Sequence, residues 1–177
     1  PQALAEQGWQ VRGTTRTPSK LADKTDQGWR ILPFQSGKPL ADATAAFADI
    51  DAIISTITAI DGSDPVLDAH GDALANFSGW SGYVSATSVY PDMPRDICYE
   101  DTKVAPATAR GKARVVAEAR WQESFGTEIF RAAGIYGVGR SPFDALRDGT
   151  ARIIEREGQV FNRIHVDDIC RIIIAAM

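Results

Sequence analysis

The sequence contains few of the residues that build metal centres, disulfide frameworks or membrane spans. Its 177 residues include two cysteines, Cys98 and Cys170, and two histidines, His70 and His165, and these are not spaced as in a zinc or thiol redox motif. No window approaches the ~18 consecutive apolar residues of a transmembrane helix. No basic segment followed by an apolar run opens the sequence. These absences predict a cytoplasmic protein with free thiols, no metal and no membrane association.

An excess of positive charge is also missing. The chain has 19 basic and 23 acidic residues, a formal net charge of -4, so its long-range field repels a polyanion. This argues against nucleic acid as the main partner, and the partner we expect is a small-molecule substrate. A composition of 44% hydrophobic and 24% charged residues is typical of one globular domain with a sizeable core.

Both ends of the sequence fall inside secondary structure. Residues 1–7 have the pattern of the last turns of a helix, and Gly8 supplies a left-handed stop. Residues 168–177 form an apolar helical pattern that ends without a cap. We therefore expect a chain cut at both ends, with at least one element before Pro1.

Between the ends, strand and helix patterns alternate. Strand patterns cover residues 9–16, 29–34, 51–58, 82–86 and 127–133, and helical patterns cover 40–49, 64–77 and a segment that ends near Phe125. In that last helix, Ala113, Val116, Ala117 and Arg120 are expected on one face. Strands separated by helix-length segments require crossover connections. The predicted fold class is α/β, with a doubly wound parallel sheet.

Ligands of such a sheet bind beyond the carboxyl ends of its strands. The first strand ends in Thr14-Thr15-Arg16, with no acidic residue. An acid at this place would bind the ribose hydroxyls of NAD, whereas a hydroxyl followed by arginine suits the 2′-phosphate of NADP. Arg16 equally fits a solvated charge at a strand end.

Two further polar clusters have plain structural interpretations. Ser85, Thr87 and Ser88 follow a buried strand, where they would reach a cofactor or a substrate carbonyl, but hydroxyl residues also favour turns. His165 with nearby acids would suit a triad with Ser85, but Ser85 lacks the glycine-flanked elbow of a serine nucleophile. We expect His165 to anchor a loop and Asp167 or Asp168 to cap the final helix.

A third cluster, Arg110, Lys112 and Arg114, falls in the first turns of a predicted helix. Positive charge there opposes the helix dipole. The pattern indicates either a nearby anion or plain solvent exposure.

Three segments, taken in order, resemble a known family. They are residues 83–90 (YVSATSVY), 129–140 (IFRAAGIYGVGR) and 163–169 (RIHVDDI). Together they resemble the extended short-chain dehydrogenase/reductases, the NAD-dependent epimerase/dehydratase superfamily, and more narrowly an atypical branch of nucleoside-diphosphate-sugar epimerases. The resemblance implies an NAD(P)-binding Rossmann domain over residues 1–177, with a small substrate-binding part starting around 137–165. It also implies a first strand with a glycine-rich turn before Pro1, and a further segment after Met177.

The catalytic positions depart from the family pattern. The family uses a tyrosine as acid-base, a lysine four residues later and a serine or threonine that orients the substrate oxygen. The resemblance puts Arg110 at the tyrosine position, Arg114 at the lysine position and Ala86 at the serine position, with Thr87 as the nearest hydroxyl. A guanidinium stabilises an oxyanion but does not shuttle a proton.

The resemblance also implies a binding site. The residues expected at the cofactor are Thr15, Arg16, Ile57, Thr58, Ser85, Gly134 and Ile135, and those expected at the substrate are Arg140 and Arg163, with Thr87. The cofactor expected from Arg16 is NADP, with NAD as the alternative. Arg140 and Arg163 would pair their guanidiniums around a diphosphate or carboxylate, although both also fit surface charges.

Two functions remain open at this stage. The first is an NADP-dependent oxidoreductase or sugar-nucleotide epimerase that uses Thr87, Tyr90 or Tyr136 as a substitute acid. The second is a sensor or structural protein that binds NADP without turnover. The family resemblance also favours a homodimer, formed through the helix that carries Arg114 and Trp121.

Overall fold

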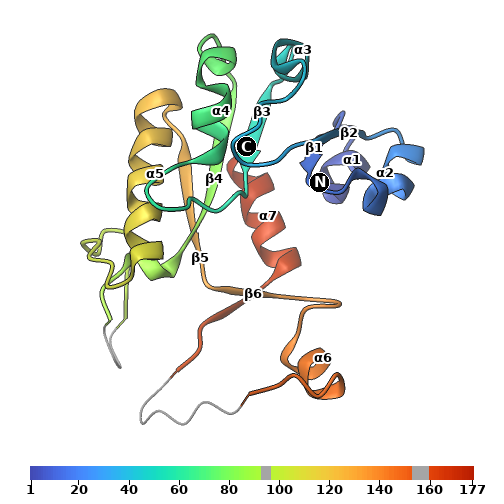
Figure 1. Cartoon of the computed structure of the whole chain (residues 1–177). Helices are drawn as coiled ribbons and strands as arrows, with labels where there is room; N and C mark the ends of the chain where they lie inside the picture. The colour runs from blue at the N-terminus through green and yellow to red at the C-terminus, as the bar shows by residue number, and fades with distance from the viewer. Residues whose placement is uncertain (93–96, 153–159) are drawn as a thin grey trace.

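A computed structural model describes residues 1–92, 97–152 and 160–177 of the chain (Figure 1). The first half contains α1 (Gln2–Glu6), β1 (Arg12–Thr15), η1 (Pro18–Leu21), α2 (Ala22–Asp26), β2 (Arg30–Pro33), α3 (Ala43–Phe47), β3 (Ala52–Ser55), α4 (Pro65–Leu74) and β4 (Trp80–Ala86). The second half contains η2 (Thr87–Val89), α5 (Ala109–Phe125), β5 (Glu128–Ala132), β6 (Gly134–Tyr136), α6 (Pro142–Arg147), β7 (Arg163–His165) and α7 (Val166–Ala176).

Every ladder between these strands is parallel. β1 pairs with β2, β4 lies between β3 and β5, and β6 pairs with β7. Helices connect the strands within the first two sheets, as parallel pairing requires. The α/β class with parallel strands is therefore confirmed.

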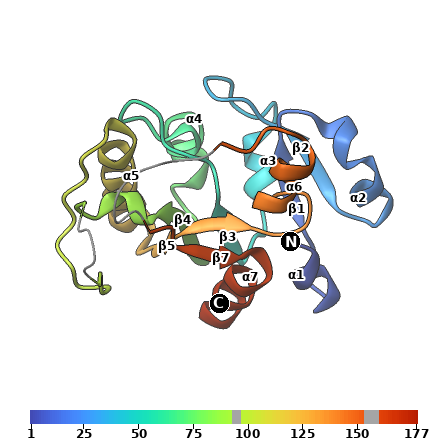
Figure 2. The ribbon, with the colours of Figure 1, turned by 90° about the horizontal axis from the view of Figure 1, so that it is seen from below.

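The central sheet has helices on both faces. Alternate residues of a strand point to opposite faces: Tyr83 packs on the side of α4 and α5, whereas Val84 packs against α7. Figure 2, seen from below, shows α7 on one side of the strands and α4 and α5 on the other. The larger core on the α4–α5 side includes the fully buried Leu74 and Trp121.

Side chains at the ends of β1 and β2 connect this strand pair to α3 and α4. No ladder joins β1 to β3 among the residues described. Instead, the Arg12 guanidinium donates to the carbonyls of Ala46 and Ala48, 3.1 and 2.5 Å away, at the end of α3. Phe34, just after β2, is buried against the ring of His70 on α4. The further strand expected before Pro1 stays a prediction.

Three details differ from the sequence-based expectations. The buried face of α5 is formed by Ala113, Ala117 and Trp121, whereas Val116 is 45% exposed. The strand expected over 51–58 ends at Ser55. The cap of α7 is His165, whose Nδ1 accepts a hydrogen bond from the Asp167 N–H at 3.3 Å. An imidazole nitrogen can accept as a carboxylate does, so Asp167 and Asp168 fall inside the first turn instead.

Local residues set the ends of two helices. Gly8 ends α1 with φ of 89°, as expected, and Ser141 and Asp144 form a capping box at the start of α6. Cys98 and Cys170 are free. In the described ranges, no helix has the length and apolarity to cross a membrane, and no cluster of three or more histidine, cysteine or acidic side chains is arranged for a metal ion.

Candidate functional site

A cavity of about 610 Å³ lies beyond the carboxyl ends of the central strands. We call it the arginine pocket. Its lining consists of Thr58, Ala59, Ile60, Asp61, Ala109, Arg110, Ala113, Arg114 and Arg140. Thr58, Arg110, Arg114 and Arg140 were predicted as site residues from the sequence, so the fold brings together four residues expected in different roles.

One wall of the pocket is the loop that follows β3. Asp61 and Gly62 both have positive φ, 50° and 79°, and form a tight turn closed by two hydrogen bonds between Ile60 and Ser63 at 2.9 and 2.8 Å. The Ser63 hydroxyl donates to the carboxylate of Asp68, which also forms an ion pair with Arg120 of α5. These contacts fix the loop against α4 and α5.

The opposite wall is the first turns of α5. The Thr108 side chain accepts from the Gly111 N–H at 3.0 Å and caps the helix. A Cβ built on Gly111 would lie under 3.0 Å from the Ser88 carbonyl oxygen, so the missing side chain lets α5 approach η2 closely. This close approach sets the position of Arg110 and Arg114.

The third contribution comes from the turn after β6. Gly137 and Arg140 exchange backbone hydrogen bonds of 3.1 and 3.0 Å. Gly139 has φ of 72°, which favours glycine there. The turn carries Arg140 to the mouth of the pocket.

Behind the pocket, a buried polar cluster supports Arg114. The Arg114 Nε is buried with no hydrogen-bond partner among the described atoms. The pKa of the fully buried Tyr83 is raised to about 12 by burial and by the charge of Asp64, which together outweigh the opposite effect of Arg114. Tyr83 therefore stays protonated at neutral pH. The Asp64 carboxylate accepts from Trp121 Nε1 at 2.9 Å and from two N–H groups at the start of α4.

The charges of the pocket are not neutralised within the described part of the chain. Arg110, Arg114 and Arg140 form no ion pair there, in contrast to Arg131, whose guanidinium donates to both oxygens of the buried Glu118 carboxylate. This ion pair raises the pKa of Arg131 further above its usual range. The three arginines are thus available to a ligand.

A second cavity of about 450 Å³ lies between β7 and α6. Its lining is Tyr136, Gly137, Ser141, Pro142, Phe143, Arg163 and His165. The Arg163 guanidinium stands 5.3 Å from the ring of Phe161 and passes over Gly134, where a Cβ would lie under 3.0 Å from it. Gly134 therefore lies against the Arg163 side chain in this structure.

The structure therefore separates the two arginines that the sequence paired at the substrate. Arg140 lines the arginine pocket with Arg110 and Arg114, whereas Arg163 lines the second cavity with Tyr136 and His165. The order of residues along the chain does not reveal that the Gly137–Arg140 turn reverses the direction of the backbone between Arg140 and Arg163.

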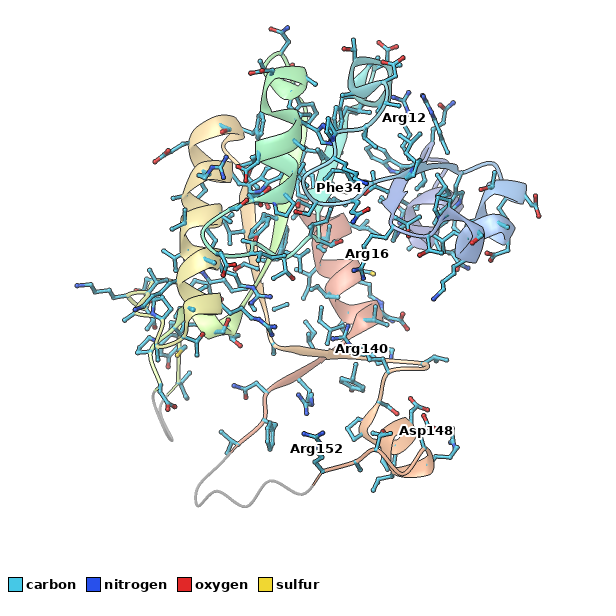
Figure 3. The ribbon with its side chains drawn as sticks, viewed as in Figure 1. Arg12, Arg16, Phe34, Arg140, Asp148 and Arg152 are labelled. Carbon is cyan, nitrogen blue, oxygen red and sulfur yellow. The ribbon has the colours of Figure 1, made fainter. Side chains whose placement is uncertain are left out.

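The predicted adenosine-binding residues lie at the tip of β1. The Thr15 hydroxyl accepts from the Thr17 N–H at 3.2 Å, and Arg16 is exposed. Arg16 has no hydrogen bond or ion pair with another described residue. Figure 3 shows Arg16 near the middle of the view, above Arg140, whereas Arg12, at the other end of β1, lies higher, beside α3.

The remaining predicted residues line neither cavity. Ile57 and Ile135 are half-buried against the two hydrophobic cores. Ser85 is buried with no hydrogen bond from its hydroxyl to a described residue. Ala86 ends β4, and Thr87 is exposed in η2.

Asp61 is a lining residue that the sequence reasoning missed. The Asp61-Gly62 dipeptide is a strong signal for a tight turn with positive φ. Such a turn directly after a strand that ends at the ligand edge would have pointed to this residue.

Tyr90 and Tyr136, the two tyrosines considered as substitute acids, have different surroundings. The Tyr90 hydroxyl accepts from Arg131 Nη1 at 3.2 Å, and the Arg131 guanidinium lies 5.1 Å from the Tyr90 ring. Tyr136 is 38% exposed in the second cavity, edge-on to His165 with ring centroids 5.1 Å apart. Of these two tyrosines, Tyr136 has the more accessible hydroxyl.

Among known proteins, only solved structures are similar to this chain. No protein-family model and no curated protein matches the chain. Among solved structures, a functionally unknown conserved protein from Silicibacter pomeroyi is 38% identical with a TM-score of 0.85, over 98% of this chain and 61% of that one.

Two enzymes from Bacillus cereus are similar in structure at lower identity. UDP-glucuronic acid 4-epimerase, solved in complex with UDP-glucuronic acid and NAD, has a TM-score of 0.71 at 17% identity, over 98% of this chain and 66% of that one. UDP-N-acetylglucosamine 4-epimerase has a TM-score of 0.70 at 17% identity, over 99% and 65%. The chain has the Rossmann-like fold of these UDP-sugar epimerases and spans about two thirds of their length or less.

Proposed function

We propose that the chain is the dinucleotide-binding part of an NADP-preferring oxidoreductase or epimerase that acts on a carbonyl or nucleotide-sugar-like substrate. The epimerase-like fold supports a nicotinamide dinucleotide, and a solved neighbour is in complex with NAD. Thr58 and the arginine pocket stand at the carboxyl edge of the parallel sheet, where such folds bind their ligands.

The observation that carries the NADP preference is the tip of β1. Arg16 is exposed, follows the Thr14-Thr15 hydroxyls, and has no ion pair with a described acid. The Thr15 hydroxyl accepts a hydrogen bond from Thr17, so its own proton is free to donate to an ester oxygen. These residues fit a 2′-phosphate: Arg16 would pair with it, and no carboxylate on this tip would repel it.

When bound, a nicotinamide supplies hydride transfer; the residues of this chain supply orientation and charge. Thr58 lines the pocket and would donate a hydrogen bond to a bound oxygen. Arg110 and Arg114 would stabilise negative charge on a substrate oxygen without moving a proton. Tyr136, the more exposed of the two candidate tyrosines, lines the second cavity and would move a proton for a substrate that reaches there from the arginine pocket.

A second candidate function is a sensor or structural protein that binds NADP without turnover. The observation that favours it is that the described lining of the arginine pocket contains no tyrosine to donate a proton. Its described lining contains guanidiniums at Arg110 and Arg114, and the nearby Tyr83 stays protonated and buried.

The cofactor proposal is tested by calorimetric titration of the chain with NADPH and NADH. We expect tighter binding of NADPH, and a loss of about tenfold or more of that affinity in Arg16→Asp. Arg152→Asp makes the same charge change at an exposed site beside α6 and should bind as the unmodified chain does. Equal affinity for both cofactors, or equal loss in both variants, would overturn the NADP preference.

Turnover separates the two functions. NADPH oxidation is followed with a panel of carbonyl compounds and UDP-sugars, in the unmodified chain and in Tyr136→Phe. Oxidation that depends on Tyr136 supports the enzyme. Tight NADPH binding without oxidation, unchanged in Arg110→Tyr, supports the silent binder.

A further inference from the structure

We propose that the arginine pocket binds a dianionic phosphate group, carried by a phosphomonoester substrate. The proposal names a substrate class for the site above. It rests on the proposed function only in treating the bound compound as a substrate, because the binding itself needs no cofactor.

The charge of the lining sets the charge of the ligand. Three guanidiniums and the single carboxylate of Asp61 leave two positive charges on the wall of one cavity. No acid in the described ranges pairs with Arg110, Arg114 or Arg140. A monocarboxylate would neutralise half of this charge, whereas a phosphomonoester neutralises all of it at neutral pH.

The guanidiniums come from independent and well-fixed elements. Arg110 and Arg114 belong to α5, held by the Thr108 cap and the close packing of Gly111 on η2. Arg140 is held by the two backbone hydrogen bonds of its turn. Convergence of arginine forks from separate elements is suited to the several oxygens of a phosphate.

The sequence of α5 adds a second, independent argument. The first turn of this 17-residue helix contains no acidic residue but carries Arg110 and Lys112, with Arg114 one turn further on. Cations at a helix N-terminus are repelled by the helix dipole. A bound anion is attracted both by these basic side chains and by the helix N-terminus, so it offsets the repulsion.

The size of the cavity favours an ester over a free ion. At about 610 Å³ it falls in the range of ~300–1,000 Å³ common for small-molecule sites. A phosphate ion would fill a small part of it. Thr58 and Asp61 would then contact the hydroxyl groups of the attached body, Asp61 as an acceptor.

The test is calorimetric titration of the chain with inorganic phosphate, glucose 6-phosphate and acetate. We expect both phosphates to bind at least about tenfold more tightly than acetate. Arg140→Met should weaken phosphate binding about tenfold, and because Arg140 is exposed this variant should fold. Arg114→Met should have a similar effect if circular dichroism shows it folded. Arg152→Met, at the exposed site beside α6, is the matched control.

The outcomes distinguish the sources of the phosphate. Tighter binding of glucose 6-phosphate supports the ester, whereas tighter binding of inorganic phosphate overturns the ester and identifies a site for the free ion. Equal binding of acetate and phosphate, or phosphate binding that Arg140→Met leaves unchanged, overturns the site itself. These experiments contain no nicotinamide, so a failed NADPH titration leaves their interpretation intact.

Discussion

Trp121→Phe is expected to destabilise the chain by removing one donor from a buried carboxylate. Trp121 is 0% exposed and its Nε1 donates to Asp64 at 2.9 Å. Asp64 keeps the two N–H donors at the start of α4, but the oxygen that accepts from Trp121 loses this partner, and Asp64 is only 1% exposed. The bond therefore connects α5 to the start of α4, the two elements that hold the walls of the arginine pocket.

The magnitude follows from two effects. A hydrogen bond to a charged group contributes about 1.5–3 kcal/mol. Replacing the indole by the smaller phenyl ring leaves space beside Tyr83, whose ring stacks on Trp121 at 6.1 Å, and costs about 1 kcal/mol more. Together the free energy of unfolding should fall by about 3 kcal/mol, which for a chain of this size lowers Tm by about 6–12 °C.

The assay is urea unfolding followed by far-ultraviolet circular dichroism. The matched control is Trp9→Phe: Trp9 is 40% exposed, and its replacement should change stability by less than about 0.5 kcal/mol. If Trp121→Phe costs as little as Trp9→Phe, the hydrogen bond to Asp64 does not contribute as argued. A double-mutant cycle with Asp64→Asn should show a coupling of about 1 kcal/mol or more.

Three further predictions concern the core and the pocket. Burial lowers the pKa of His70 from 6.5, so His70 should leave the free energy of unfolding unchanged above this pH and reduce it at lower pH. When urea unfolding is compared at about pH 7.5 and about pH 5.5, the free energy of unfolding should therefore fall less on acidification in His70→Leu than in the unmodified chain. Glu118→Gln leaves the 25% exposed Arg131 without its counter-ion and should cost about 3 kcal/mol by urea unfolding. Gly111→Ala forces α5 away from the Ser88 carbonyl, which should cost about 1–3 kcal/mol and weaken phosphate binding in calorimetry.

For each of these three predictions, one outcome would contradict the physical reason given. An equal loss of stability on acidification in His70→Leu would show that other groups bind the proton. A neutral Glu118→Gln would mean that water replaces the carboxylate at Arg131. Full phosphate affinity in Gly111→Ala would show that the close packing of α5 on η2 does not set the arginine positions.

Much of the fold could be predicted because local patterns decided it. Gly8, the Asp64-Pro65 start of α4 and the Ser141–Asp144 box each satisfy backbone groups within a few residues, and all three appear as expected. The parallel sheet followed from helix-length connections between strands. These features depend on short-range physics that a sequence displays directly.

The errors arose where tertiary contacts decide. Helical periodicity puts Ala113, Val116, Ala117 and Arg120 on one face, yet only the two alanines are buried, and Trp121 completes the buried face where α5 crosses β4. Trp121 is consequently no part of an outer face of α5, so a homodimer through this helix, which stays a prediction, would use residues such as Val116.

In the candidate site too, local patterns indicate single residues, whereas tertiary contacts decide which of them lie together. A strand end points to Arg16 and a helix start to Arg110 and Arg114, whereas Arg140 is expected only from the family resemblance. Which of them share a pocket depends on the turn after β6, and no spacing rule gives that direction. The grouping of Arg140 with Arg110 and Arg114 became visible only in three dimensions.

The central claim is that the carboxyl edge of the sheet offers three arginines to one anionic ligand. A crystal structure of the chain with glucose 6-phosphate tests it most directly. We expect the phosphate group within hydrogen-bond distance of the guanidiniums of Arg110, Arg114 and Arg140. A sugar phosphate bound elsewhere, with these side chains turned to solvent, would contradict it.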